Sequence, residues 1–311
     1  MKTLVILVLF CSSLCVSHAL PLKKSCIQWN HFEWVEYKVE NVHFDKAALL
    51  IPITLKGTAT SNYLQLDLGI NSSTLDETPF RKIQAEAGKP HSSAQIATID
   101  CKIGGIELSQ QPMVIQQDRE TSRSTNAPQN IIGSLGIDFF TNRILVLDYP
   151  AQRFAILSST AILPAVITQN VRYIRANQRN DKIFIPLSID ETEYPDDFIF
   201  NMGTSPLPLV TTKALWQKAT GRTGNEPDNQ VLTLENTKFI GAPIQKKTCI
   251  GILQITHSMA YFVPEQASLD FENCPFRIKG FIGNEPFYKD YTVIIDLPHK
   301  RFGILQTSTV N

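Results

Sequence analysis

The chain has 311 residues, of which 43% are hydrophobic and 19% are charged, and its formal net charge is zero. This balance is typical of a globular protein with a substantial core and excludes broad disorder. Because no dense run of lysine or arginine occurs, a nucleic-acid or anionic-membrane partner has no electrostatic support. The length favours two domains or one large two-lobed domain.

The N-terminal segment has the three parts of a secretory signal peptide. Lys2 provides a positive start, residues 4–10 are apolar, and Ser17-His18-Ala19 fits a cleavage site between small residues. The apolar stretch is too short to span a membrane, and no later stretch approaches the roughly 20 apolar residues that a spanning helix needs. We therefore expect a signal peptide over residues 1–19, no membrane span, and export to the periplasm or the cell exterior.

Cysteine usage fits an exported chain. Two of the six cysteines leave with the signal peptide, and four remain: Cys26, Cys101, Cys249 and Cys274. An even number in this setting indicates two disulfides, with three possible connectivities. We favour Cys249–Cys274, which are close in sequence, and Cys26–Cys101 by default; buried free thiols are the alternative. Neither Cys-x-x-Cys nor a metal-binding histidine spacing occurs, so we expect no metal site and no cofactor.

The mature chain is rich in predicted strands. Short runs of Ile, Val, Leu, Phe and Thr recur between turns that contain Gly, Pro, Asn or Asp. In chain order they include residues 48–55, 62–68, 96–103, 112–116, 143–149, 182–189, 198–202, 247–255 and 291–297. Helical periodicity is scarce, and residues 211–220 are the best helix candidate, with Thr211 or Thr212 as the cap. The pattern predicts an all-β fold.

Two halves of the sequence are similar to each other. The segment that starts at residue 51 matches the one that starts at residue 185 without a gap, which aligns Asp67 with Asn201 and Gly69 with Gly203. Each half then closes on a second gapless match, DYPAQRFAIL in the first and DLPHKRFGIL in the second. Two matches in the same order indicate an internal duplication. We expect an N-terminal β lobe over residues 20–165 and a C-terminal β lobe over residues 166–311.

The duplicated turns resemble those of the two-lobed, pepsin-like aspartic peptidases, with closing segments closer to retropepsin-type domains. The family has a strand, then Asp-x-Gly, then an apolar-apolar-Gly element, in each half. Here the first half has Asp67-Leu68-Gly69 and 131–133, which ends at Gly133, and the second has Asn201-Met202-Gly203 and 281–283, which ends at Gly283. The resemblance covers essentially the whole mature chain. It implies a bilobal all-β fold with a cleft between the lobes, and one such glycine element beneath each turn.

In that family one carboxyl group from each lobe is needed, because the two acids lie about 3 Å apart and share one proton. This chain supplies Asp67, whereas Asn201 carries an amide, which can hydrogen-bond but cannot ionise. The catalytic dyad is therefore degenerate.

The residues around the turns depart from the family in the same direction. Leu68 and Met202 stand where the family usually has threonines that hydrogen-bond between the lobes, so these side chains are expected to pack instead. After each glycine the family expects a hydroxyl; Ile70 lacks it and Thr204 keeps it.

We therefore expect an exported, catalytically inactive homologue that is monomeric and binds a peptide, glycan or protein ligand in the cleft. The alternative is an active endopeptidase in which Asp67 pairs with an unrecognised acid such as Asp196 or Asp197. These precede Asn201 by five and four positions, so on a strand they would lie more than about 10 Å from it.

The aromatic segment 26–37 is expected to form a strand. It either ties the lobes together and buries Trp29 or Trp34, or lies in the cleft as a built-in occupant.

Overall fold

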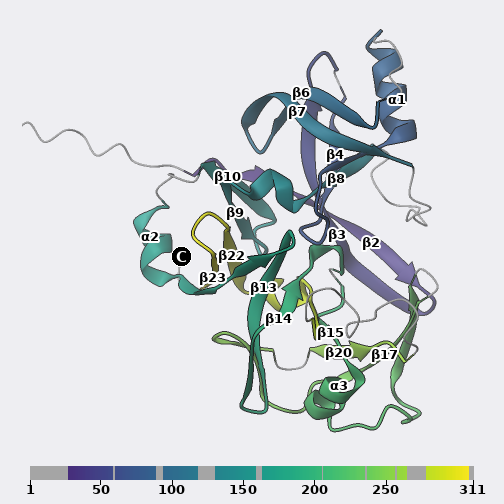
Figure 1. Ribbon diagram of the computed structural model, residues 1–311, viewed down its shortest axis with the longest axis vertical. Coiled ribbons are helices and arrows are strands. Elements are labelled where there is room, and N and C mark those ends of the chain that lie inside the picture. Colours follow the sequence, from purple (N-terminus) through teal and green to yellow (C-terminus); the bar gives the residue numbers. More distant parts are fainter. Residues whose placement is uncertain are drawn as a thin grey trace, which may run out of the picture.

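The computed structural model describes residues 27–58, 60–88, 94–117, 130–158, 163–204, 206–234, 237–255, 258–264 and 278–307. Within these ranges the chain forms two β-rich lobes joined by a shared sheet (Figure 1). The all-β, bilobal fold expected from the sequence is confirmed. The predicted signal peptide lies outside the described residues. Among the described residues, no helix is both long and apolar enough to cross a membrane.

The N lobe is a seven-stranded sheet that closes on itself. Its strands lie in the order β2 (Glu33–Val39), β3 (Val42–Leu55), β4 (Asn62–Leu66), β8 (Ile131–Leu135), β5 (Thr74–Asp76), β7 (Ile106–Gln116) and β6 (Ile96–Ile103). β6 also pairs with the end of β3, with Ile53 opposite Ile103, and this pairing closes the ring. Helix α1 (Glu77–Glu86) follows β5 and buries Phe80 against the core.

The C lobe is a larger, ten-stranded sheet. Its main path runs β16 (Gln230–Leu234), β17 (Thr237–Pro243), β20 (Met259–Phe262), β15 (Leu209–Thr211), β21 (Gly280–Ile282), β14 (Thr192–Phe200), β13 (Lys182–Ile189), β18 (Thr248–Ile250) and β19 (Leu253–Gln254), and β12 (Asn177–Arg179) pairs with β13. Helix α3 (Lys213–Thr220) confirms the predicted helix. Thr212 caps it by accepting a hydrogen bond from Leu215 N, and Gly221 ends it with a φ of 72°.

The two lobes repeat one strand order. β3, β4, β8, β5 and β7 correspond to β13, β14, β21, β15 and β20. In both lobes the strand before the turn pairs in parallel with the strand that carries the glycine element, β4 with β8 and β14 with β21. The lobes differ in closure, because Leu187 of β13, the counterpart of Ile53, pairs with Ile250 of β18.

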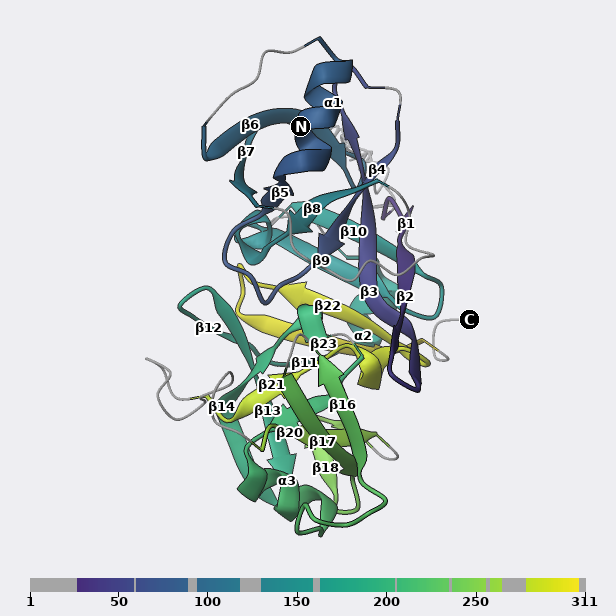
Figure 2. The same cartoon turned by 90° about the vertical axis from the view of Figure 1, so that its right-hand side faces the viewer.

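A six-stranded antiparallel sheet lies between the lobes (Figure 2). Its order is β1 (Asn30–His31), β10 (Arg153–Ser158), β9 (Arg143–Asp148), β22 (Tyr291–Asp296), β23 (Arg301–Gln306) and β11 (Arg172–Arg175). At its centre Val146 lies opposite Ile294. These residues are equivalent, since each stands two positions before the Asp of its closing segment. The halves are therefore related by an approximate two-fold axis through this pair.

The aspartates of the closing segments are structural. Asp148 Oδ2 accepts a 2.7 Å hydrogen bond from Arg153 Nε, and the Asp296 carboxylate accepts hydrogen bonds from Arg301. Each pair joins the two residues that flank the turn of a β-hairpin, because Arg153 lies opposite Asp148 and Arg301 lies opposite Asp296. Pairing with arginine satisfies two carboxylates that the fold buries almost completely.

Neither predicted disulfide is seen among the described residues. Cys101 and Cys249 are free thiols, and the partners proposed for them, Cys26 and Cys274, lie outside the described residues. Cys101 lies on β6 where the N-lobe ring closes, opposite Leu55. Burial there raises the pKa of its thiol to about 11, which makes the reactive thiolate scarce at neutral pH.

Candidate functional site

The two duplicated turns meet at the lobe interface. Asp67 follows β4, and Asn201 follows β14. In each turn a side-chain oxygen accepts a hydrogen bond from the backbone of the glycine two residues later: Gly69 N to Asp67 Oδ1 at 2.8 Å, and Gly203 N to Asn201 Oδ1 at 2.9 Å. A β-carbon on Gly69 would overlap Asn201 Oδ1, and one on Gly203 would lie 2.6 Å from Asp67 Oδ2. Each glycine thus lies against the polar side chain of the opposite lobe.

The strands beneath the turns reveal a different register from the one expected. Asp67 N donates to Leu135 O at 3.0 Å, and Asn201 N donates to Ile282 O at 2.9 Å. Leu135 and Ile282 are therefore equivalent, and the N-lobe counterpart of Gly283 is Gly136. The sequence alignment had paired Gly283 with Gly133, so that pairing does not hold in the structure.

Gly133 has its own counterpart in Gly280. A β-carbon on Gly133 would overlap the carbonyl oxygen of Thr74, and one on Gly280 would overlap that of Val210. The two lobes thus share a Gly-x-x-Gly element over residues 133–136 and 280–283. Alignment on both glycines, with one extra residue later in the second half, would have found this equivalence from the sequence.

The residues next to the two polar positions are apolar and buried. Leu68 is 0% exposed and Met202 is 1% exposed, and both belong to the large hydrophobic cluster that includes residues of both lobes. Asp67 is 7% exposed, whereas Asn201 is half-buried. Met202, Gly203 and Thr204 form the short helix η2 (Met202–Thr204). The site therefore combines two polar side chains with an apolar surround.

A lysine that sequence reasoning missed reaches the Asp67 turn from the other lobe. Lys182 begins β13, and its Nζ donates to Gly69 O and, at 2.5 Å, to Asn71 Oδ1. Burial lowers the pKa of Lys182, while the negative charge of Asp67 acts in the opposite direction. The gapless repeat aligns Lys182 with Ala48, which has no charge. The site therefore has an acid in the N lobe and a cation from the C lobe.

The two acids considered as replacement partners for Asp67 are engaged within the C lobe. Asp197 Oδ2 lies 2.8 Å from Lys279 Nζ. Asp196 Oδ1 accepts a hydrogen bond from Asn177 Nδ2 of β12. Both lie on β14, Asp196 five and Asp197 four residues before Asn201, and the partners of their carboxylates are not part of the turns.

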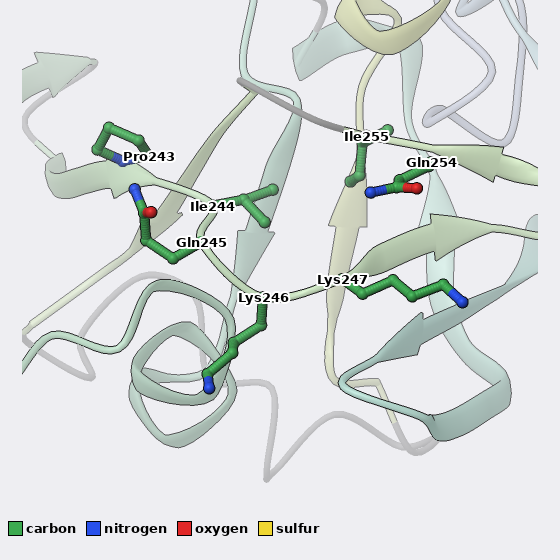
Figure 3. Close-up of a pocket in the computed structure, with 7 residues that line it drawn as sticks. All are labelled: Pro243, Ile244, Gln245, Lys246, Lys247, Gln254 and Ile255. Atoms are coloured by element: carbon green, nitrogen blue, oxygen red, sulfur yellow. The ribbon is translucent and has the colours of Figure 1, made fainter.

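Other features of the described residues lie away from the turns. A pocket on the C lobe is lined by residues of the segment that joins β17 to β18 and of the stretch at β19: Pro243, Ile244, Gln245, Lys246, Lys247, Gln254 and Ile255 (Figure 3). It contains neither Asp67 nor Asn201. Among the described residues, no group of three or more His, Cys, Asp or Glu could hold a metal ion.

The strand order, the shared sheet and the facing turns form the pepsin-like arrangement that the duplicated sequence indicates. No family model matches the chain, and no curated protein matches its sequence.

Similar folds occur among solved structures. An aspartic proteinase from Irpex lacteus is 14% identical with a TM-score of 0.49, and the match covers 85% of this chain and 97% of that one. Basic 7S globulin from soybean is 9% identical with a TM-score of 0.49, covering 90% of this chain and 95% of that one. Conglutin gamma, a basic 7S globulin from lupine seeds, is 9% identical with a TM-score of 0.48, covering 90% and 95%. At these identities the likeness concerns the fold alone.

Proposed function

We propose that the chain is an exported, non-hydrolytic protein that binds a peptide, glycan or protein ligand between its two lobes. One observation carries the proposal: the facing turns present a carboxylate and a carboxamide, and a lysine of the C lobe reaches the turn of the carboxylate.

The chemistry of this arrangement differs from that of a two-acid site. Amide hydrolysis by facing acids depends on one proton shared between two carboxyl groups. The Asn201 amide keeps the hydrogen bond that holds the turn, but it does not ionise and so cannot share a proton with Asp67 as a second carboxyl group would. Lys182 gives Asp67 an opposite charge as its neighbour, where a two-acid site would provide a second acid. A positive charge near Asp67 favours its ionised form and does not supply the shared proton that a two-acid site uses to activate water.

The fold offers a different mode of binding to each of the three ligand classes. An extended peptide binds to exposed strand edges by adding a strand, and β16 stands at one end of the C-lobe sheet. A glycan or a folded protein would use the polar groups of the turns instead. Binding measurements with each class distinguish them.

A cleavage assay tests the absence of hydrolysis. The mature protein is incubated with unfolded casein from pH 3 to 7, with and without a transition-state peptide inhibitor. We expect no inhibitor-sensitive cleavage from the wild type or from Asn201→Asp, because Lys182, Leu68 and Met202 remain in place. Inhibitor-sensitive cleavage by the wild type that disappears in Asp67→Ala would overturn the proposal and restore the endopeptidase alternative.

A binding assay tests the site. Labelled unfolded casein, a glycan array and a peptide array are screened against the wild type and against Asn71→Trp, which places a bulky side chain beside the Asp67 turn at an exposed position. We expect the bound class to be lost in Asn71→Trp and retained in the control Lys56→Trp, which is also exposed. Equal binding by both variants would place the ligand elsewhere.

A further inference from the structure

The outer part of the β2–β3 hairpin, residues 36–45, projects from the N lobe, and we call it the arm. β3 pairs with β4 at residues 50–53 and with β6 at residues 53–55, whereas residues 42–44 pair with β2. The N-lobe ring is therefore closed by the other half of β3. The hairpin runs toward the C lobe in Figure 1, and its end lies beside β16 in Figure 2.

The tip of the arm rests on an apolar surface of the C lobe. Val42 and Phe44 pack against a cluster that we call the C-lobe patch, made of Leu207, Val210, Leu232, Phe239 and Tyr261. The residues that alternate with them, His43 and Asp45, are exposed. Because successive residues of a strand face opposite sides, one face of the arm is used for contact with the C lobe and the other faces solvent.

The base of the arm is attached at a second point. Tyr288, which follows η3 (Glu285–Phe287), donates a 3.0 Å hydrogen bond to Lys46 O. Lys46 Nζ lies 5.0 Å from the centre of the Tyr288 ring, and the rings of Trp34 and Tyr288 are 4.9 Å apart. β3 also lies against η2, the turn that follows Asn201. The arm therefore crosses from one lobe to the other beside the candidate site.

The attachment has the features of a contact that opens locally. Val42 and Phe44 are only partly buried, Val39 of β2 is the buried apolar residue of the arm, and the arm contributes no strand to the ring. At the base of the arm, Trp34 Nε1 is buried and has no hydrogen-bond acceptor. A buried donor without an acceptor makes this end of the hairpin less stable. Segments with few buried apolar contacts belong to the least stable parts of a native fold.

We propose that the arm is an intramolecular clasp that covers the C-lobe patch beside the Asn201 turn. When it is closed, it occupies the apolar surface that a ligand side chain would use. A ligand with an apolar or aromatic side chain reaches the patch only when the arm lifts. The inference holds whether or not the chain hydrolyses peptides, because it depends on the contacts of the arm and not on the chemistry of the turns.

Hydrogen exchange on the whole mature protein tests the clasp. The variant Val42→Ser/Phe44→Ser weakens the docked face, and His43→Ser changes the solvent face of the same strand. We expect faster exchange in residues 36–45 and in β16 and β17 for the double variant and not for His43→Ser, with β9 and β22 unchanged. Faster exchange that includes β9 and β22, or no change in β16 and β17, would overturn the proposal, because the arm would then be part of the core or uncoupled from the patch.

A peptide probe tests whether the patch becomes available. A labelled, cyclised peptide with the sequence EYKVENVHFD, residues 36–45, is titrated into each protein. We expect binding to Val42→Ser/Phe44→Ser to be at least about tenfold tighter than to the wild type or to His43→Ser, because the closed arm reduces the binding-competent fraction. Equal affinity for all three proteins, or no binding to any, would overturn the proposal.

The variant Tyr288→Phe keeps the test decisive if the double variant is poorly folded. It removes the hydrogen bond to Lys46 O and leaves the ring contact with Trp34 in place. We expect a smaller increase in exchange over the same segments. An unchanged exchange pattern in Tyr288→Phe together with a misfolded double variant would contradict the clasp.

Discussion

The Asp67 turn and the Asn201 turn have nearly the same backbone and different chemistry. Each donates its first backbone N–H to the glycine-bearing strand, at 3.0 and 2.9 Å, and each side-chain oxygen accepts from a glycine N–H, at 2.8 and 2.9 Å. One side chain is an acid and the other an amide. The turn needs only an acceptor oxygen at this position, and a carboxamide supplies it as well as a carboxylate does.

This comparison separates folding from catalysis. The hydrogen bonds that shape the turn do not require a proton to be exchanged, whereas hydrolysis does. A chain can therefore lose the second acid and keep the facing turns. The charge difference also explains Lys182, which comes from the lobe without the acid and contacts the turn that has it.

The largest expected effect comes from the glycines that the two lobes share. In Gly133→Ala or Gly280→Ala the new methyl group would overlap a backbone carbonyl of the next strand, so we expect a loss of about 3 kcal/mol in the free energy of unfolding. Urea unfolding measures it. In the control Gly88→Ala the φ is 66° and no atom lies within 4 Å, so only backbone strain of about 1 kcal/mol is expected. Equal losses in all three variants would contradict the shared close approach.

A smaller effect is expected at the polar contact between the halves. Tyr149 OH donates a buried 2.8 Å hydrogen bond to Asn284 Oδ1, and burial raises the pKa of Tyr149 well above its ordinary value. Tyr149→Phe should lower the free energy of unfolding by about 1 to 2 kcal/mol, because a buried acceptor loses its donor. Thermal unfolding detects this change. Tyr63→Phe removes an exposed hydrogen bond to Glu33 and should cost less; the reverse order would show that the contact between the halves contributes little.

Lys182, the cation that contacts the Asp67 turn, should contribute still less to the free energy of unfolding. Lys182→Met removes the hydrogen bonds to Gly69 O and Asn71 Oδ1, and we expect a loss of about 1 kcal/mol in chemical unfolding. Lys56→Met removes an exposed 3.4 Å ion pair with Asp100 and should have no measurable effect. If both variants unfold at the same denaturant concentration, Lys182 does not hold the lobes together.

The smallest effect concerns Glu285, a partly buried acid of the C lobe. Glu285, in η3, occupies the place of Ile137 in η1 (Ile137–Phe140), since each stands two residues before a buried phenylalanine. Burial raises the pKa of Glu285 above its ordinary value of 4.5, although Ser258 and Lys289 oppose this. The native state therefore keeps a proton that the unfolded state has released. Stability should fall as the pH rises from about 4.5 through the folded pKa.

Glu285→Gln should remove the fall in stability with rising pH, as measured by the urea midpoint of unfolding at several pH values. Glu226 provides a control of opposite sign, because hydrogen bonds, first from the Thr223 backbone, lower its pKa to about 2. Its contribution is present above pH 4.5 and is lost as the pH falls toward 2. A wild-type profile that Glu285→Gln leaves unchanged would show that this carboxyl is not desolvated.

Local features of the sequence were sufficient for the fold class and for the facing turns. Period-2 apolar runs predict strands because each strand buries one face. The gapless repeat placed Asp67 opposite Asn201 because no insertion separates either turn from the strands before it. Helix α3 followed from its own cap, Thr212.

The tertiary structure decided the rest, because those features depend on residues that are distant along the chain. The equivalence of Gly136 with Gly283 is offset by one residue from the match of the closing segments, and the hydrogen bonds of β8 and β21 decide between it and the pairing of Gly133 with Gly283. Lys182 acts through the reach of a long side chain across the interface, which no spacing encodes. The arm is an ordinary amphipathic hairpin in sequence, and only the packing of Val42 and Phe44 on the C lobe shows where its apolar face is buried.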